Sequence, residues 1–457
     1  MKLSAKIRNV NINRKWGPIL KKVNVLGGGL AGCEAAYRIA SSGIEVDLWE
    51  MRPEKTTPVH QTSNLAELVC SNSLKSELEN TAQGLLKKEM KTFGSLLLWC
   101  ADKARVPAGS ALAVDRNVFA ELVTAKITSH PNIRINRQEV TSIPKDEISI
   151  IATGPLTSEA LSRQIALLGG EDNLYFFDAI APSVTEESID KTKAFKASRY
   201  GKGTDDYYNC PLSKAEYQEF YDNLIDADIK EGHSIDKNLF FSGCMPIEIM
   251  ARRGKDTLCY GPMRPVGLTG PDGDDLAYAV LQLRQEDQAG QIYGLVGFQT
   301  RLRWGEQDRI LRLIPALKNA EFVRYGAMHR NTYINSPNIL KPTLQFKGNE
   351  RVFFAGQITG VEGYMESAAT GIVTGINVVN LVKGREPVIL SANTMLGALI
   401  DFITHSNAKN FQPVNANFGL LPPLNQRIRN KVQRYEAYTE RALAELNKYS
   451  ELFMELL

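Results

Sequence analysis

A glycine-rich turn near the start of the chain constrains the fold more than any other feature. A short apolar segment typical of a buried strand leads into Gly27, Gly29 and Gly32, which form a GxGxxG pattern ahead of a helix-like stretch. A second strand-like segment ends at Glu50, roughly 20 residues further on. Such glycines permit a tight turn and let a pyrophosphate approach the backbone, and such a carboxylate can accept hydrogen bonds from a ribose diol. The pattern predicts a dinucleotide site, with a purely structural glycine turn as the alternative.

Composition narrows the class of protein. The chain has 457 residues, enough for roughly three domains at about 150 residues each. Its 43% apolar and 23% charged residues are typical of soluble globular proteins and exclude collagen, disordered chains and coiled-coil rods. With 54 Lys and Arg against 51 Asp and Glu, the net charge of +3 gives no overall attraction to polyanions. A nucleic-acid surface would therefore require local clusters of basic residues.

The cysteines and apolar runs bear on the cellular compartment. The six cysteines lie apart, with no CxxC pair, which favours a reducing cytosol over a secreted disulfide scaffold. No uninterrupted apolar run approaches the ~18–20 residues that cross a bilayer, so we expect a cytoplasmic protein with no membrane partner. Residues 1–20 are basic and lack the apolar core of a secretory signal; we expect a loose extension, with an organelle-targeting segment or an RNA-touching arm as alternatives.

Two later segments repeat the strand-and-glycine pattern. A strand-like stretch ends at Thr153 and Gly154, and another ends at Gly356 and Gln357, ahead of a helix rich in small residues that begins near Tyr364. In this order the three segments resemble those that contact the cofactor in glutathione-reductase-type flavoproteins. The acidic residue that usually follows the late glycine is replaced by Gln357.

The spacing of these segments predicts the domain organisation. About 190 residues separate the second and third segments without a simple βαβ rhythm, which indicates an inserted domain. We expect an α/β protein: a Rossmann-like, FAD-binding domain of the glutathione-reductase type, interrupted by a large α/β insertion and followed by a helical segment. The expected parts are a basic extension at 1–20, the two parts of the FAD-binding domain at 21–181 and 346–390, the inserted substrate and RNA domain at 182–345, and the helical segment at 391–457.

The last part of the chain is predicted to be an amphipathic helix. Its apolar residues alternate at steps of four and three, while Arg427, Arg429, Lys431 and Arg434 place positive charge at its start. That sign is unfavourable at a helix N-terminus. We expect the helix to dock on the protein or on a dimer mate, with a phosphate contact as the alternative; the sequence leaves the oligomeric state open.

Several strings together resemble one family, the folate- and FAD-dependent tRNA (uracil-5-)-methyltransferases, or TrmFO family. The resemblance runs from about residue 23 to residue 421. The strings lie at 27–32 (GGGLAG), 65–73 (LAELVCSNS), 107–116 (PAGSALAVDR), 243–248 (GCMPIE), 323–331 (VRYGAMHRN) and 356–364 (GQITGVEGY).

The resemblance implies a reaction that suits a flavoprotein. C5 of uracil is a poor nucleophile until a thiolate adds at C6. Methylenetetrahydrofolate supplies a one-carbon unit at the formaldehyde level, so forming a methyl group also takes two electrons. The family therefore uses FAD, with 5,10-methylenetetrahydrofolate and NADH or NADPH as cosubstrates, and the expected product is 5-methyluridine at the T-loop of tRNA. We expect no metal.

Two cysteines lie in the matched strings. Cys244 matches the nucleophile that attacks uracil, and Cys70 matches the second functional cysteine, which assists or protects the flavin-bound intermediate. Glu248 is a candidate proton-transfer partner, and Arg252 and Arg253 would favour a thiolate at Cys244.

The remaining candidates fall into three groups. The FAD-binding candidates are Gly27, Gly28, Gly29, Leu30, Ala31, Gly32, Glu50, Thr153, Gly154, Gly356, Gln357 and Tyr364. The folate and base candidates are Arg284, Gln299, His329, Arg330 and Asn331, each with a structural role as the alternative. The RNA phosphate candidates are Arg252, Arg253, Lys255 and Arg264, with a solvated loop as the alternative.

Three rival functions remain open from the sequence. The same chemistry on a uridine of 23S rRNA is the nearest, because members of this family differ in their RNA target. A plain FAD/NAD(P)H oxidoreductase acting on a small molecule is less favoured, since the paired cysteines of disulfide reductases are absent. A non-catalytic RNA-binding flavoprotein is disfavoured by the presence of both Cys70 and Cys244.

Overall fold

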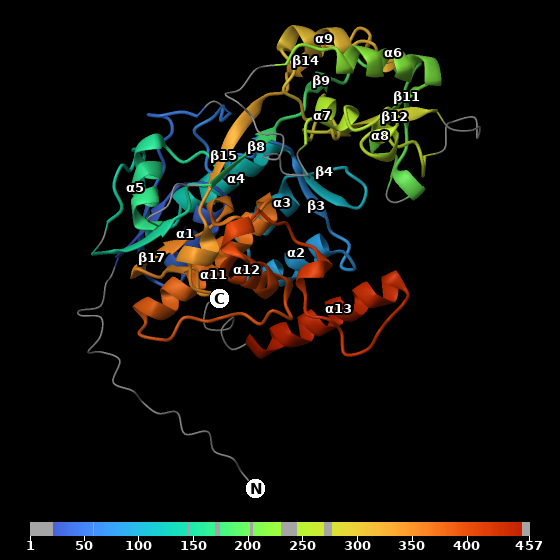
Figure 1. The fold of residues 1–457 in the computed structure, drawn as a ribbon. Helices are drawn as coiled ribbons and strands as arrows, with labels where there is room; N and C mark the ends of the chain where they lie inside the picture. Colours follow the sequence, from blue (N-terminus) through green and yellow to red (C-terminus); the bar gives the residue numbers. More distant parts are fainter. Residues whose placement is uncertain are drawn as a thin grey trace.

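A computed structural model describes residues 22–449 apart from residues 58, 145, 170–173, 202–203, 230–244 and 269–276. The described residues form two units, each with its own hydrophobic core, joined by a long two-stranded ribbon (Figure 1). The predicted extension at 1–20 lies outside the described residues.

The first unit is built on a six-stranded sheet with strand order β16-β17-β7-β1-β2-β6. The four central pairings, from β17 to β6, are parallel, and the edge strand β16 is antiparallel. Its strands are β1 (Lys22–Leu26), β2 (Glu45–Trp49), β6 (Ile133–Asn136), β7 (Ile148–Ile151), β16 (Gln345–Phe346) and β17 (Asn349–Phe354). Strands β1, β7 and β17 each lead through a glycine turn into a helix, as the sequence pattern predicts. The predicted Rossmann-like α/β class is confirmed.

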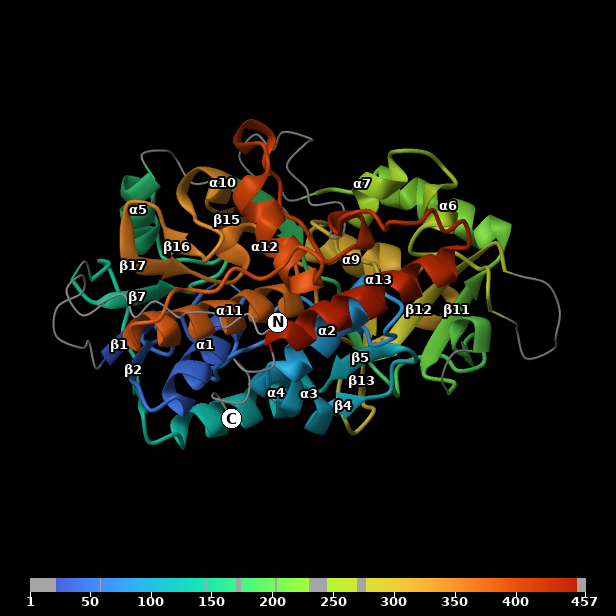
Figure 2. The same cartoon turned by 90° about the horizontal axis from the view of Figure 1, so that it is seen from below.

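Helices from distant parts of the chain cover this sheet. Helix α1 (Leu30–Ser41) packs along α11 (Tyr364–Val382) and against β1, β2 and β6 (Figure 2). Small residues permit the close approach, since a Cβ added at Gly371 would lie 2.8 Å from the Cα of Ala31. The other helices of this unit are α2 (Ala82–Thr92), α3 (Leu96–Lys103), α4 (Arg116–Thr128), α5 (Glu159–Gly169), α10 (Ser336–Ile339) and α12 (Met395–His405).

Helix α11 is long and apolar enough to cross a membrane by length and hydropathy alone. In the structure 94% of its most apolar window is buried inside the protein, because α1, α2 and α12 pack around it. It is the central core helix of the first unit.

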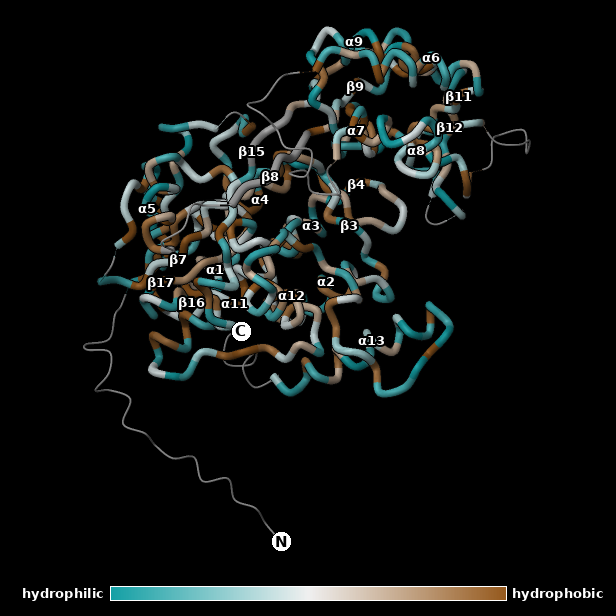
Figure 3. Tube along the Cα trace, viewed as in Figure 1, coloured by the Kyte–Doolittle hydropathy of each residue, from teal (hydrophilic) through white to brown (hydrophobic). Residues whose placement is uncertain are grey.

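The second unit is built on an antiparallel six-stranded sheet with strand order β10-β11-β12-β13-β9-β14. Helices α6 (Lys214–Ile225) and α9 (Trp304–Leu311) alternate hydrophilic and hydrophobic residues (Figure 3), and their buried positions join the second core. The strands are β9 (Ser183–Thr185), β10 (Phe195–Lys196), β11 (Tyr207–Leu212), β12 (Ala279–Gln285), β13 (Ile292–Leu295) and β14 (Phe322–Arg324). The helices are α6 (Lys214–Ile225), α7 (Ile247–Ala251), α8 (Thr257–Tyr260) and α9 (Trp304–Leu311).

Two smaller sheets complete the fold. Strands β8 (Leu174–Ala179) and β15 (Met328–Tyr333) pair antiparallel over six residues and form the ribbon between the units. Strands β3 (Ser73–Ser76), β4 (Arg105–Val106) and β5 (Ala111–Val114) form a small sheet in the first unit. The second core spans Val184 to Ala320, inside the insertion predicted at 182–345. The exact boundaries at 181, 345 and 390 stay predictions.

The predicted C-terminal helix is present as α13 (Lys431–Leu446). Its buried residues Thr439, Ala442 and Leu446 face the protein, and the Thr439 hydroxyl donates to the Glu79 carbonyl at 2.9 Å. The helix therefore docks on its own chain, and Asn430 caps its N-terminus by accepting hydrogen bonds from two backbone N–H groups. Residues 450–457 lie outside the described residues.

Candidate functional site

The first glycine turn connects β1 to α1 and leaves a cradle at the helix start. Gly27 has a φ of +105°, and a Cβ there would lie 2.6 Å from the Ala152 carbonyl oxygen, so only glycine fits. Gly29 is the N-cap of α1 and makes no side-chain cap, and a Cβ added there would meet no atom within 4 Å. Open space before uncapped N–H groups at a helix N-terminus suits a pyrophosphate.

Glu50 follows β2 and lies beside this turn. Its carboxylate accepts from the Gly28 N–H at 3.0 Å and from Nε of Arg52 at 2.9 Å. Burial alone would raise the pKa of Glu50, but the Arg52 guanidinium and the two backbone donors outweigh it and hold that pKa below its usual value. Glu50 is therefore an anion at neutral pH. Arg52 also bonds Glu67, at 2.9 Å, which fixes the guanidinium in place.

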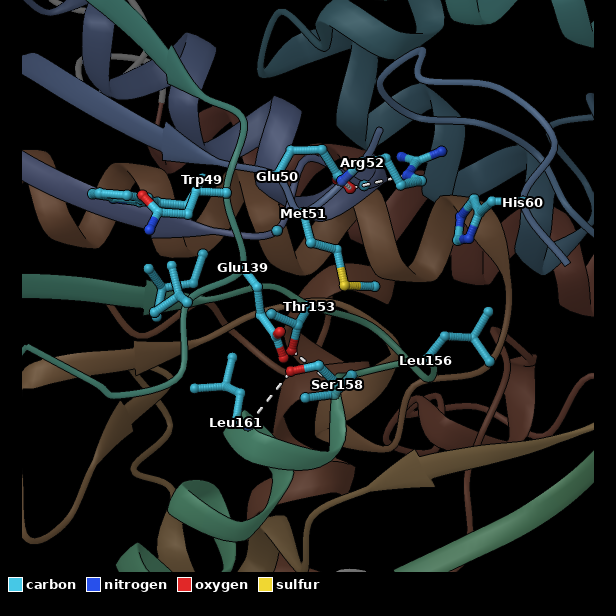
Figure 4. Close-up of a pocket in the computed structure, with 16 residues that line it drawn as sticks. Trp49, Glu50, Met51, Arg52, His60, Glu139, Thr153, Leu156, Ser158 and Leu161 are labelled. Atoms are coloured by element: carbon cyan, nitrogen blue, oxygen red, sulfur yellow. Dashed lines mark hydrogen bonds and ion pairs between the residues drawn. The ribbon is translucent and has the colours of Figure 1, made fainter. Parts of the chain in front are cut away.

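A hollow opens at the carboxyl ends of β1, β2 and β7 (Figure 4). Glu50 and Arg52 lie on one side of it, and Glu139, Thr153 and Ser158 gather on the other. In doubly wound sheets ligands bind at such ends, where the strand order reverses. The sequence analysis found Glu50 and Thr153 but missed Arg52, Glu139 and Ser158; the adjacent Arg52 could have been noticed as a cation next to the expected ribose acid.

The late glycine turn packs against the first. Gly356 has a φ of +85°, and a Cβ there would lie 3.0 Å from Cβ of Ala31, so this turn touches the start of α1. Gln357 donates from Nε2 to Glu362 Oε2 at 2.5 Å. The carboxylate of Glu362 thus lies beside Gln357. Of the other cofactor candidates, Leu30 is half-buried in α1, and Gly154 has a φ of +65° directly after Thr153.

Helix α11 begins at Tyr364 and fixes the loop that carries Cys70. The phenolic oxygen of Tyr364 accepts from the N–H groups of Cys70 and Ser71, at 2.8 and 3.1 Å. Burial raises the pKa of Tyr364, so the hydroxyl stays neutral. We call residues 70–72 the Cys70 loop. The structure thus brings two predicted site residues together from opposite ends of the first unit.

The second unit reaches the same loop through Arg284. Its Nε donates to Oδ1 of Asn72 at 2.9 Å, and its Nη2 donates to the Ser71 hydroxyl at 2.8 Å. Asn72 in turn donates from Nδ2 to the Gln285 carbonyl at 2.9 Å. The Cys70 loop therefore lies at the seam between the two units, which is where ligand sites commonly form.

Glu248 is buried in the first turn of α7. Its carboxylate accepts from the Thr300 hydroxyl at 2.9 Å and from the Arg301 N–H at 3.2 Å. Burial raises the pKa of Glu248 despite these hydrogen bonds. Gln299 contributes its carbonyl oxygen, which accepts from the Ile247 N–H at 2.8 Å. Cys244 lies outside the described residues, so its relation to Glu248 stays a prediction.

Three folate and base candidates lie on the ribbon strand β15. Asn331 is 1% exposed, and within the described part of the chain its Oδ1 has no hydrogen-bond partner. A buried oxygen of this kind is suited to a ligand donor. The backbones of His329 and Arg330 pair with Asp178 and Phe177 in β8, while their side chains lie outside the described residues.

The predicted phosphate contacts lie on the surface of the second unit. Arg252, Arg253, Lys255 and Arg264 are all exposed. Arg264 donates to the hydroxyl of Tyr200 at 3.2 Å. The sequence analysis missed the aromatic residues here: Tyr200 is 60% exposed and Tyr260 is 85% exposed. Basic and exposed aromatic side chains together are typical of single-stranded nucleic-acid sites.

Comparison with known proteins agrees with this architecture. Residues 22–386 match the family model described as "Glucose inhibited division protein A". The chain is 63% identical over 432 residues to the methylenetetrahydrofolate–tRNA-(uracil-5-)-methyltransferase TrmFO of Syntrophomonas wolfei, covering 94% of this chain and 99% of the relative. It is 54% identical to the TrmFO of Bacillus cereus strain AH820, covering 93% and 98%. The chain therefore belongs to the glucose inhibited division protein A family and, within it, to the TrmFO methyltransferases.

Solved structures give the same fold. The GidA protein of Aquifex aeolicus, in its form II crystal, superposes with a TM-score of 0.66 at 16% identity, covering 96% of this chain and 76% of that protein. At that identity the likeness shows the fold alone. The predicted resemblance to the TrmFO family is confirmed.

Proposed function

We propose that this protein forms 5-methyluridine in tRNA, with 5,10-methylenetetrahydrofolate as the one-carbon donor and FAD as the electron carrier, reduced by NADH or NADPH. One observation carries the proposal. A protein named for this activity is 63% identical over 99% of its own length. Identity at that level leaves little room for a different reaction in the same fold.

The first glycine turn and its surroundings fit FAD. The open cradle at Gly29 and the uncapped start of α1 would hold the pyrophosphate, and Glu50 would accept from the ribose hydroxyls. The turn at Gly356 and the start of α11 at Tyr364 would hold the ring end near the Cys70 loop. When bound, FAD supplies the two electrons that convert a methylene into a methyl group.

The residues of the chain would then act on uracil. The thiolate of Cys244 would add to C6 of the base and thereby make C5 nucleophilic towards the one-carbon donor. Glu248 is the candidate for moving the proton that C5 must lose. Cys70 would serve as the second functional thiol, positioned by Tyr364 and by the Arg284 contacts to its loop. Arg284, Gln299, His329, Arg330 and Asn331 stay proposed folate or base contacts.

The RNA would be held by local basic surfaces because the net charge is only +3. Arg252, Arg253, Lys255 and Arg264 would contact phosphates, and Tyr200 and Tyr260 would stack on unpaired bases. Binding through such residues should weaken as salt rises. A cytoplasmic location is proposed from the TrmFO relationship and the cysteine pattern.

A direct assay tests the function and the RNA target. Purified protein is incubated with ¹⁴C-methylenetetrahydrofolate, NADH or NADPH, and either a tRNA transcript or a 23S rRNA transcript. We expect labelled 5-methyluridine in tRNA, identified by mass spectrometry of the nucleosides. Label in 23S rRNA with none in tRNA would show that 23S rRNA is the target. No label in either RNA would overturn the proposed methyltransferase function.

A further inference from the structure

A group of charged side chains lies at the seam between the two units, and only one of them, Arg284, has a role in the proposed function so far. Arg116 begins α4 in the first unit, whereas Arg284, Glu286 and Arg324 belong to the second sheet or follow it directly. We call these four residues the arginine cluster. Their position beside the Cys70 loop follows from the contacts of Arg284 with Ser71 and Asn72.

Glu286 is the anion at the centre of the arginine cluster. Its side chain is 4% exposed, and its Oε2 lies 2.6 Å from Nη2 of Arg116. Its Oε1 lies 3.3 Å from Nη2 of Arg324. The Ser183 hydroxyl donates to Oε2 at 2.9 Å. Burial would raise the pKa of Glu286, but the three arginines outweigh that effect and hold the pKa below its usual value, so Glu286 is ionised.

The charges of the cluster do not balance. Arg116 and Arg324 pair with the one carboxylate, and Arg284 is a third positive charge near it. Within the described ranges no other carboxylate forms an ion pair with any of the three arginines. Burial lowers the pKa of both Arg284 and Arg324, which shows that these cations are partly removed from water. An uncompensated charge in such a place is unfavourable. A surplus of two positive charges therefore fits a bound anion.

The cluster also has hydrogen-bond donors to spare. The Nε of Arg324 is buried and has no partner among the residues that the structure covers. The guanidinium of Arg116 donates from Nη2 to Glu286 and, among the described residues, makes no other hydrogen bond. The side chains of Arg116 and Arg324 are 21% and 16% exposed, so a ligand can reach them. The planar fork of a guanidinium matches the two oxygens of a carboxylate or phosphate.

We propose that the arginine cluster is an oxyanion site that binds a carboxylate or phosphate group of a substrate next to Cys70. The proposal rests on the proposed function, because both expected substrates carry such a group. The glutamate of methylenetetrahydrofolate has carboxylates, and the RNA has phosphates. The hydrogen bonds from Arg284 to Ser71 and Asn72 place the anion beside the Cys70 loop, the expected site of chemistry.

Two substitutions with opposite effects on the charge test the site. Arg324→Gln lowers the positive surplus by one, whereas Glu286→Gln raises it by one. An anion site predicts that R324Q weakens binding and that E286Q preserves or strengthens it. A merely structural ion pair predicts that both variants weaken binding alike. Arg312→Gln, which removes a surface pair with Asp308 in the same unit, is the matched control.

Binding is measured by calorimetry on the full-length protein, so that no methyl transfer is needed. The probes are tetrahydrofolate, tetrahydropteroate, which lacks the glutamate, and a tRNA transcript. We expect R324Q to weaken one interaction about tenfold or more, as expected from the loss of a charge-assisted hydrogen bond. If the anion is the folate carboxylate, tetrahydrofolate binding weakens and tetrahydropteroate binding does not. If it is an RNA phosphate, tRNA binding weakens and its salt slope falls by about 1.

Two results would contradict an anion site at the arginine cluster. Unchanged affinity for all three probes in R324Q, or equal losses in R324Q and E286Q, would reduce the cluster to a structural ion pair. Thermal unfolding checks that the variants fold. If E286Q does not fold, two other variants test the site: Arg116→Gln should weaken binding, and Arg324→Lys, which keeps the charge, should retain part of it. These binding results stand apart from the proposed function, which fails only if the wild-type protein methylates no RNA.

Discussion

The hydroxyl of Tyr364 accepts a hydrogen bond from the backbone of Cys70, at 2.8 Å, and so joins the start of the core helix α11 to the loop of the second functional cysteine. The same oxygen accepts from Ser71 at 3.1 Å. One half-buried side chain thereby fixes the position of the loop that carries a half-buried thiol.

Replacement of Tyr364 tests this link. Tyr364→Phe leaves two backbone N–H groups without their acceptor, which should lower the free energy of unfolding by about 1–3 kcal/mol. The methyl-transfer rate should fall further than stability explains, because the Cys70 loop loses its anchor. Urea unfolding and the tRNA methylation assay measure the two effects. Tyr438→Phe on the surface helix α13 is the control, and equal behaviour of the two variants would contradict the link.

The open cradle at Gly29 leads to a second prediction. Gly29 has a φ of −79°, which any residue can adopt, and a Cβ meets no protein atom there. Gly29→Ala should therefore keep the stability of the protein but lose FAD, since the methyl group enters the space meant for the pyrophosphate. The ratio of absorbance at about 450 nm to that at 280 nm reports bound FAD. Gly305→Ala, which also adds a methyl in open space, should retain FAD.

The nucleophile assignment has a separate test. Cys244→Ala should abolish methyl transfer and leave the yellow FAD complex intact, because the proposed role of the thiolate is at the base and not at the cofactor. Cys259→Ala is the control, because Cys259 lies outside the matched strings and is half-buried against the second core. Retained activity in Cys244→Ala would remove the assignment.

The buried carboxyl of Glu89 predicts a pH dependence of stability. It accepts from the N–H groups of Met395 and Leu396 at the start of α12, at 2.7 and 2.8 Å, yet burial raises its pKa to about 7. A carboxyl whose pKa is raised in the folded state stabilises the fold less as pH increases from the unfolded pKa to the folded one. The free energy of unfolding should therefore fall by about 3 kcal/mol between pH 4.5 and pH 7 through this group.

Glu89→Gln should remove that part of the pH dependence. Urea unfolding at pH 5, 6, 7 and 8 should show the difference between the variant and the wild type shifting in favour of the variant as pH rises. Glu121→Gln, at an exposed position of α4, should follow the wild-type profile. Parallel profiles for E89Q and the wild type would show that Glu89 stays ionised when buried.

Local patterns predicted the part of the site that is local in sequence. The turn at Gly27, the acid at Glu50 and the late glycine at Gly356 each follow a strand, and strand-then-glycine spacing is visible in the sequence. The contact between Cys70 and Tyr364 joins residues almost 300 positions apart, and Arg284 meets Ser71 from a different unit. No periodicity encodes such pairs, because the first depends on tertiary packing within the first unit and the second on how the two units pack.

The antiparallel pairing of β8 with β15 places the chain's entry to the second unit next to its exit, since Ala179 pairs with Met328. The second unit is therefore an insertion in the β8–β15 hairpin. If it were removed and the two strand ends were joined by a tight turn, an ordinary two-stranded hairpin would remain. The first unit would keep its parallel sheet and both glycine turns. The second unit therefore leaves and rejoins the first at a single pair of neighbouring residues.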